Sequence, residues 1–173
     1  TQRVGVVGIG GLGHLAVKFA RAWGCEVTAF TSSPGKRDEA LAMGAHQVVA
    51  STDPAAVAAL AGRLDLVLVA VNVAMDWNAL LGTLAPRGRL HFVGAVLEPV
   101  AVPAFSLIGG QKSLSGSPIG SPASMAKMLE FCARHGIEPQ VEHFPMARAN
   151  EALEHLRAGR ARYRVVLDAD WGA

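Results

Sequence analysis

A glycine-rich segment near the start of the chain has the spacing of a loop that binds phosphate groups. Residues 8–13, Gly-Ile-Gly-Gly-Leu-Gly, match the pattern G-x-G-x-x-G, between the strand-like run Val4–Val7 and a helical pattern at Leu12–Trp23. In this context the first glycine allows a tight turn, the second lets the backbone approach a pyrophosphate, and the last lets the helix pack closely on the strand. Free N–H groups at the helix N-terminus would attract the anion. The segment therefore predicts a dinucleotide site; a glycine-rich turn without a ligand is the alternative.

The residues after the next strand-like run are those that would contact the adenosine ribose. In dinucleotide-binding folds an acidic residue about 20 residues beyond the glycines binds the ribose hydroxyls of NAD. Here Thr31, Ser32 and Ser33 stand at that place, followed by Lys36 and Arg37. Hydrogen bonds from such groups to a 2′-phosphate contribute about 1.5 to 3 kcal/mol each. The segment therefore predicts NADP rather than NAD; a simple turn with solvated cations is the alternative.

Short apolar runs alternate with helical patterns from the start of the chain to about residue 93. The strand-like runs are Val4–Val7, Val27–Phe30, Gln47–Ala50, Leu66–Val71 and Arg89–Val93. The helical patterns between them are residues 12–23, 36–43, 55–61 and 76–84. Connections long enough for a helix specify a parallel sheet covered on both faces. The predicted fold class is therefore α/β, with a doubly wound Rossmann sheet.

Beyond this region the regular alternation stops. Residues 97–121 are rich in proline, glycine and serine, which favour short strands and turns. The later elements are predicted as helices at 124–135 and 147–158 and a last strand at 163–167. The change of pattern places the end of the nucleotide-binding domain, residues 1–118, at about residue 118.

The composition excludes several classes of protein. Of the 173 residues, 51% are hydrophobic and 17% are charged, a balance too apolar for a disordered chain. The apolar runs, such as Leu66–Val71, are far shorter than the roughly 20 residues that cross a bilayer, so no membrane partner is expected. A net charge of +2 is too small to favour nucleic acid as a partner. No signal peptide is recognisable before the first strand-like run, and a cytoplasmic location is expected.

The cysteines and histidines do not have the spacing of a metal site. Cys25 and Cys132 form no CxxC pair, which argues against a zinc ribbon, a redox pair or a disulfide framework and fits a reducing compartment. The six histidines show no ligand spacing. His14, in the first turn of the loop helix, is expected to pack or to support the site through another residue, rather than to touch the cofactor. We therefore predict neither a metal ligand nor a catalytic residue within this chain.

Six segments spread over the chain carry a family likeness. They are residues 8–18 (GIGGLGHLAVK), 31–41 (TSSPGKRDEAL), 116–120 (GSPIG), 129–132 (LEFC), 149–152 (ANEA) and 162–168 (RYRVVLD). Together they resemble the medium-chain zinc-dependent alcohol dehydrogenases, and within these the NADP-preferring, cinnamyl-alcohol-dehydrogenase-like branch. The likeness covers essentially the whole chain. Pro118 departs from the pattern, because many members of the family have a larger apolar residue there.

The resemblance implies a set of cofactor contacts. The pyrophosphate contacts would be Gly8, Gly10, Gly11, Leu12 and Gly13. The 2′-phosphate contacts would be Ser32, Ser33 and Lys36, beside Thr31. The nicotinamide contacts would be Ala70, Val71, Asn72, Val93, Gly94, Ala95, Ser117 and Ile119. Arg164 resembles an arginine that reaches back to the pyrophosphate; a solvated member of the nearby arginine cluster is the alternative.

The resemblance also implies an activity that needs more than this chain. In the family a GroES-like catalytic domain precedes the nucleotide-binding domain and supplies a zinc ion that polarises the substrate oxygen. The C-terminal segment, residues 119–173, would belong partly to that domain. The parent protein would transfer hydride between NADP(H) and an alcohol or aldehyde, and would form a homodimer through the sheet edge near Val100–Ser115.

Two alternatives to this function stay open. One is a zinc-free quinone or enoyl reductase of the medium-chain type, which upstream sequence without cysteines at zinc-ligand spacing would support. The other is an isolated NADP-binding module without catalysis, which is what the chain predicts when it is taken by itself.

Overall fold

The computed structural model describes residues 2–169, which form two units. The first unit extends to Ile137 and the second begins at Glu138. This division comes later in the chain than residue 118, because helix α6 (Pro122–His135) groups with the first unit. That residues 119–173 belong partly to a catalytic domain stays a prediction.

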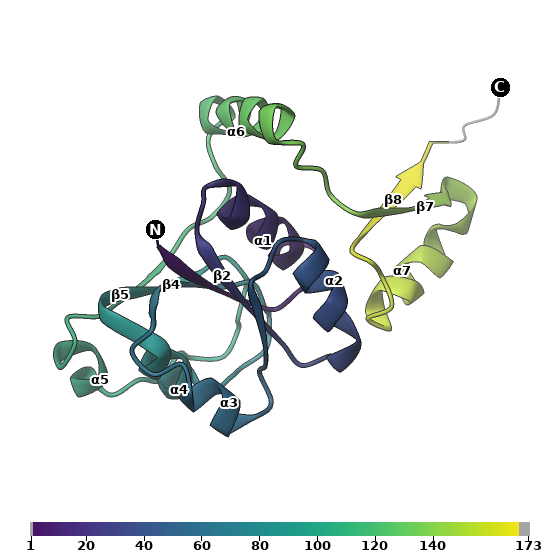
Figure 1. The fold of residues 1–173 in the computed structure, drawn as a ribbon. Coiled ribbons are helices and arrows are strands. Elements are labelled where there is room, and N and C mark those ends of the chain that lie inside the picture. The colour runs from purple at the N-terminus through teal and green to yellow at the C-terminus, as the bar shows by residue number, and fades with distance from the viewer. Residues whose placement is uncertain (1, 170–173) are drawn as a thin grey trace. The chain divides into compact units, whose positions relative to one another are not determined.

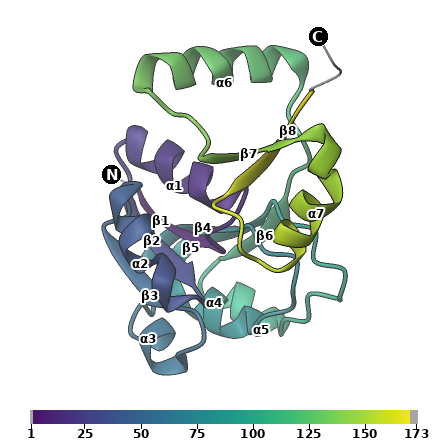
Figure 2. The same ribbon diagram turned by 90° about the vertical axis from the view of Figure 1, so that its right-hand side faces the viewer.

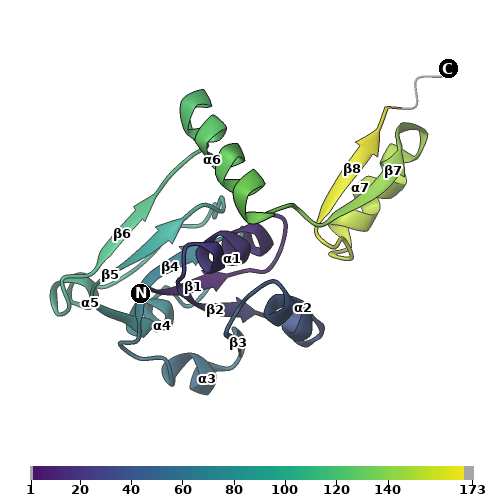
Figure 3. The same cartoon turned by 45° about the horizontal axis from the view of Figure 1, so that its top comes forward.

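A parallel six-stranded sheet forms the centre of the first unit, in the order β3-β2-β1-β4-β5-β6 (Figure 3). The strands are β1 (Arg3–Val7), β2 (Glu26–Thr31), β3 (Gln47–Ala50), β4 (Leu64–Val69), β5 (Leu84–Phe92) and β6 (Ser113–Gly116). The order runs outward from the centre in both directions, and the chain crosses over between β3 and β4. This doubly wound arrangement confirms the predicted fold class.

Helices lie on both faces of the sheet, as Figures 1 and 2 show for α1 on one side and α3 and α4 on the other. The connecting helices are α1 (Gly13–Ala22), η1 (Pro34–Lys36), α2 (Arg37–Ala42), α3 (Pro54–Ala58), α4 (Trp77–Thr83) and α5 (Ala104–Ile108). Asp53 and Asp76 cap α3 and α4, since their carboxylates accept hydrogen bonds from backbone N–H groups of the first turn. Within residues 2–169, no helix is long and apolar enough to cross a membrane.

The face under α3 and α4 is filled by one apolar cluster. Its buried members are Val7, Phe30, Val49, Val57, Leu60, Leu64, Val67, Val69, Trp77, Leu80, Leu81, Leu84 and Leu90. On the opposite face, Val17 and Ala20 of α1 are buried. Farther along that face a groove of about 910 Å³ lies between the sheet, α1 and α6.

The edge strand β6 covers less of the chain than the predicted sheet edge near Val100–Ser115. Strand β6 begins only at Ser113, and the preceding residues include the short helix α5. Proline and glycine in this region do favour short elements, as the sequence indicates.

The second unit is a small strand–helix–strand structure. Strands β7 (Val141–Pro145) and β8 (Arg164–Asp168) pair in parallel, and η2 (Met146–Arg148) and α7 (Ala149–Arg157) connect them. Glu142 of β7 accepts hydrogen bonds from the Arg162 backbone N–H and from His155 Nε2. These contacts join α7 and the chain before β8 to the first strand of the unit.

Candidate functional site

A cleft of about 470 Å³ lies at the carboxyl ends of β1, β2 and β4. It is lined by Val7, Gly8, Ile9, Gly10, Phe30, Thr31, Ser32, Ser33, Lys36, Ser51, Thr52 and residues 70–76. The strand order reverses between β1 and β4, and ligands of open α/β sheets bind in the crevice at such a point. The topology therefore brings the predicted loop, ribose and β4 residues to one place.

The glycines of the loop have separate physical roles. Gly8 has a positive φ of 90°, which residues other than glycine rarely adopt. A Cβ atom on Gly13 would lie 1.7 Å from the Gly8 carbonyl oxygen, so only glycine lets α1 approach β1 this closely. A Cβ on Gly10 would meet no atom within 4 Å, because that position faces open space. Gly8 and Gly13 therefore shape the backbone, and Gly10 leaves room for a ligand.

The N-terminus of α1 is suited to an anion. Leu12 occupies the N-cap position and supplies no side-chain acceptor, and the first turn contains no acidic residue. The N–H groups at a helix start carry the positive end of the helix dipole and are satisfied by caps, water or ligands. Lys36 adds a positive charge at the cleft, where its Nζ donates to the Ile9 carbonyl at 2.8 Å.

The end of β2 forms a turn built by a threonine. Thr31 is buried, and its Oγ1 accepts the Ser33 backbone N–H at 3.1 Å. Its hydroxyl is thus part of the turn, while Ser32 is exposed and Ser33 is partly exposed at the cleft. Arg37 points to another partner, the Val48 carbonyl at 3.1 Å, and does not line the cleft.

The ends of β4 and β5 are joined closely at the other side of the cleft. The Ala70 N–H donates to the Val7 carbonyl at 2.8 Å, and the Gly94 N–H donates to the Val69 carbonyl at 2.9 Å. A Cβ on Gly94 would lie 2.1 Å from the Val71 carbonyl oxygen. Glycine at position 94 therefore allows the chain after β5 to contact the chain after β4.

The predicted nicotinamide residues do not all border the same cavity. Ala70, Val71 and Asn72 line the cleft, whereas Val93, Ser117 and Ile119 line the groove beside α6. Ala95 is exposed and borders neither cavity. Of the loop residues, Gly11 and Leu12 lie at its helical end, and Leu12 is 49% exposed.

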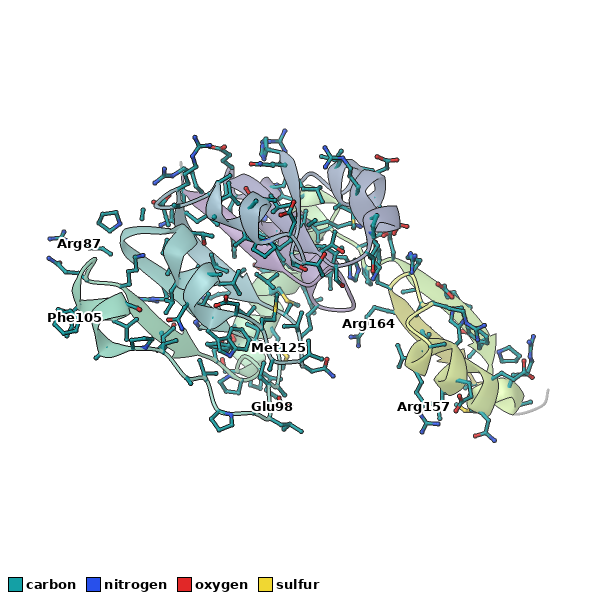
Figure 4. The ribbon with its side chains drawn as sticks, turned by 90° about the horizontal axis from the view of Figure 1, so that it is seen from below. Arg87, Glu98, Phe105, Met125, Arg157 and Arg164 are labelled. Atoms are coloured by element: carbon teal, nitrogen blue, oxygen red, sulfur yellow. The ribbon has the colours of Figure 1, made fainter. Side chains whose placement is uncertain are left out.

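Arg164 belongs to the second unit, where it is exposed at the first position of β8 (Figure 4). Its proposed reach to the pyrophosphate stays a prediction.

Some residues at the site escape sequence reasoning. Ser51 and Thr52 line the cleft directly after β3, and Met75 and Asp76 line it before α4. Their positions at the carboxyl ends of parallel strands are a signal that could have identified them. His14, which the sequence analysis places in the first turn of this helix, is fully buried, and its Nδ1 lies 2.9 Å from the Gly10 carbonyl oxygen.

The charged pair at the opposite end of the sheet has a structural role. Arg3 binds the Asp65 carboxylate, with Nη2 and Oδ1 2.8 Å apart, and so joins the amino ends of β1 and β4. This hydrogen bond lowers the pKa of Asp65 below its ordinary value. Within residues 2–169, no group of three or more His, Cys, Asp or Glu side chains is arranged to hold a metal ion. The described residues therefore do not fit a zinc site.

A doubly wound parallel sheet with a glycine-rich loop at its switch point is the Rossmann arrangement, which is typical of dinucleotide-binding domains. Residues 11–134 match the family described as zinc-binding dehydrogenase, and the chain belongs to this family.

Individual relatives agree with this assignment. The chain is 56% identical over 167 residues to an aldehyde reductase of Synechocystis, across 96% of this chain and 50% of that protein. A cinnamyl alcohol dehydrogenase structure from Sorghum bicolor matches with a TM-score of 0.93 and 43% identity, over 96% of this chain and 48% of that one. A cinnamyl alcohol dehydrogenase from Helicobacter pylori, complexed with NADP(H), matches with a TM-score of 0.84 and 32% identity, over 96% and 48%. The chain thus spans about half the length of the relatives it matches.

Proposed function

We propose that this chain is the NADP-binding portion of a zinc-dependent alcohol dehydrogenase. The observation that carries the proposal is the cleft itself, where the glycine loop and the hydroxyl side chains after β2 lie beside Lys36. The Helicobacter relative, whose structure is described as complexed with NADP(H), supports the same cofactor.

Each group at the cleft would bind one part of the cofactor. Backbone N–H groups of residues 10–13 would bind the pyrophosphate at the start of α1. Ser32, Ser33 and Lys36 would bind the 2′-phosphate, and Thr31 would hold their turn in place through the Ser33 N–H. Lys36 would add a charge-assisted bond to the phosphate, because its ammonium group has three N–H donors and one of them suffices for the contact with the Ile9 carbonyl.

The remaining predicted residues would lie toward the nicotinamide. Residues 70–72 would border the ring, and Val93, Gly94, Ala95, Ser117 and Ile119 would supply backbone contacts. Arg164 would bind the pyrophosphate from the C-terminal segment. When bound, NADP(H) supplies the hydride that is exchanged with the substrate.

Calorimetric titration of the purified chain with NADPH and NADH tests the cofactor. We expect NADPH to bind at least about tenfold more tightly, because the 2′-phosphate gains charge-assisted hydrogen bonds worth about 1.5 kcal/mol or more. Ser33→Asp should weaken NADPH binding about tenfold or more, since a carboxylate then faces the phosphate, while NADH binding changes little.

Ser106→Asp is the matched control, because it introduces the same charge on α5, outside both the cleft and the groove. It should leave both affinities unchanged. Equal affinity for NADH and NADPH, together with no effect of Ser33→Asp on either, would contradict the assignment of residues 31–36.

The activity proposed for the parent protein is reversible hydride transfer between NADP(H) and a small alcohol or aldehyde. The isolated chain should reduce no aldehyde, because the described residues do not fit a zinc site. Aldehyde reduction by the purified 173-residue chain would contradict the proposal that the zinc site lies in another part of the parent protein. A zinc-free quinone or enoyl reductase is the alternative parent, and metal analysis of the whole protein distinguishes the two.

The edge of the sheet is the proposed contact with a second copy. Strand β6 is the last strand in the sheet order, and Phe105 and Ile108 of the neighbouring α5 are 82% and 66% exposed. Phe105 projects from this end of the first unit in Figure 4. Sedimentation of the whole protein should show a dimer that Ile108→Glu weakens; a monomeric wild type would contradict the contact. A cytoplasmic location stays a prediction.

A further inference from the structure

We propose that His14 is a positioning residue that orients the pyrophosphate-binding loop. The inference rests on the proposed cofactor function. His14 lies in the first turn of α1 and has no exposed surface. Its Nδ1 atom is 2.9 Å from the Gly10 carbonyl oxygen, and its backbone nitrogen is 3.1 Å from the same oxygen.

The geometry fixes the tautomer of this histidine. A carbonyl oxygen only accepts hydrogen bonds, so Nδ1 carries the proton and donates it. The Gly10 carbonyl then receives two hydrogen bonds, one from the helix backbone and one from the imidazole. Both lone pairs of the oxygen are engaged, and the peptide between Gly10 and Gly11 is held from two directions.

Orientation of this peptide determines where the next N–H group points. A trans peptide is planar, so the Gly10 C=O and the Gly11 N–H point in opposite directions. When His14 holds the carbonyl toward the helix, the Gly11 N–H points away from it, out of the N-terminal end of α1. Gly10 borders the cleft, so this N–H is directed to the side where the pyrophosphate would bind.

The loop needs such a constraint because glycine has more conformational freedom than any other residue. The preceding peptide is held in a comparable way, since Lys36 Nζ donates to the Ile9 carbonyl at 2.8 Å. Two consecutive carbonyls of the loop therefore bind side chains from other positions. Fixing the loop before the ligand arrives lowers the ordering cost of binding.

The affinities for two ligands distinguish a role in orienting the loop from a general role in stability. NADPH contains the pyrophosphate, whereas 2′-AMP contains the adenosine and the 2′-phosphate alone. His14→Leu should weaken NADPH binding about fivefold, the effect of one lost hydrogen bond, and should change 2′-AMP binding less than about twofold. His14→Gln, whose amide can donate, should recover part of the NADPH affinity.

Val17→Ala is the control for lost packing. Val17 is fully buried on the same helix, and its apolar side chain has no donor for the loop. This variant should lower the unfolding midpoint and leave the ratio of the two affinities unchanged. If His14→Leu does not fold, His14→Phe, which keeps a ring without the donor, takes its place.

Nitrogen-15 NMR of the wild-type protein tests the tautomer directly, and we expect a protonated Nδ1. A proton on Nε2 alone would overturn the proposal, as would equal weakening of both ligands or unchanged NADPH affinity in the apolar variants. If the wild-type chain binds neither NADPH nor 2′-AMP, the proposed cofactor function itself fails, which is a different result.

Discussion

The two faces of the parallel sheet are packed differently, although the same strands supply both. On the face under α3 and α4, Val67 and Val69 of β4 have no exposed surface. On the other face, Leu66 and Leu68 of the same strand are partly exposed and line the groove beside α6. Met128 of α6, across this groove, is 42% exposed.

The two faces of the sheet should therefore contribute unequally to the stability of the first unit. Burial of apolar area contributes roughly 25 cal/mol per Å², so most stabilisation from β4 comes from the filled face. The other face is closely packed where α1 meets β1, with Val6 and Val17 buried and Gly13 close to Gly8, and it is open at the groove. The stability of the first unit should therefore depend on the filled cluster and on this contact between α1 and β1, and little on the groove.

The largest expected effect is at that contact. Gly13→Ala places a methyl group 1.7 Å from the Gly8 carbonyl oxygen, so α1 cannot stay where it is. We expect a loss of more than about 3 kcal/mol in the free energy of unfolding, measured by urea denaturation followed by circular dichroism. Gly10→Ala, at an open position, should retain nearly wild-type stability and weaken NADPH binding. Equal stability of the two variants would contradict the close contact.

Two leucine-to-alanine variants, one on each face of the sheet, measure this difference in stability. Leu90→Ala removes a fully buried side chain from the filled cluster and should cost about 3 kcal/mol. Leu68→Ala removes a partly exposed side chain at the groove and should cost about 1 kcal/mol. Urea denaturation of both variants gives the two values. A loss for Leu68→Ala as large as that for Leu90→Ala would show that the groove face is filled in solution.

The smallest effect concerns the amino end of the sheet, away from both cavities. Arg3 lowers the pKa of Asp65, so the pair stabilises the fold above about pH 3.9, the pKa of an unfolded aspartate, and this contribution is lost as pH falls through the lowered folded value. Since both side chains are partly exposed, solvent screens the pair, and we expect its contribution to the free energy of unfolding to be the smallest of the effects considered. Asp65→Asn should therefore be less stable than wild type at pH 6, with a smaller difference at pH 2. An unchanged difference in urea midpoint at the two pH values would exclude this linkage.

Local patterns were enough to predict the sheet and the loop. The strands read as apolar runs because both faces of a parallel sheet are covered, and the loop has a glycine spacing that only a strand–helix turn requires. Such patterns do not show how completely each face is filled. Leu66–Val69 are all apolar, yet alternate members of this run differ in exposure.

The parts that were missed depend on contacts distant in sequence. Strand β5 begins at Leu84, before the predicted start at Arg89, because Leu84 pairs with Leu64 across a register shift. Helix α6 groups with the first unit, where Phe131 stacks on Phe19 with ring centroids 6.0 Å apart. At the site, the sequence predicted the glycines and the hydroxyl residues, but not that Val93 and Ser117 would line a different cavity from Val71.

The strand order also determines when the cleft can form during folding. Strand β1 comes first in the chain, yet one of its neighbours is β4, where Val4 pairs with Leu66. Joining them closes a chain segment of about 60 residues, and pairings of such separation form slowly. The loop and the turn after β2 can assemble earlier, but residues 70–76 complete the cleft only once β4 has docked. A dinucleotide that needs both sides of the cleft would therefore bind after this closure, and its binding energy would retain the central strand pair against unfolding.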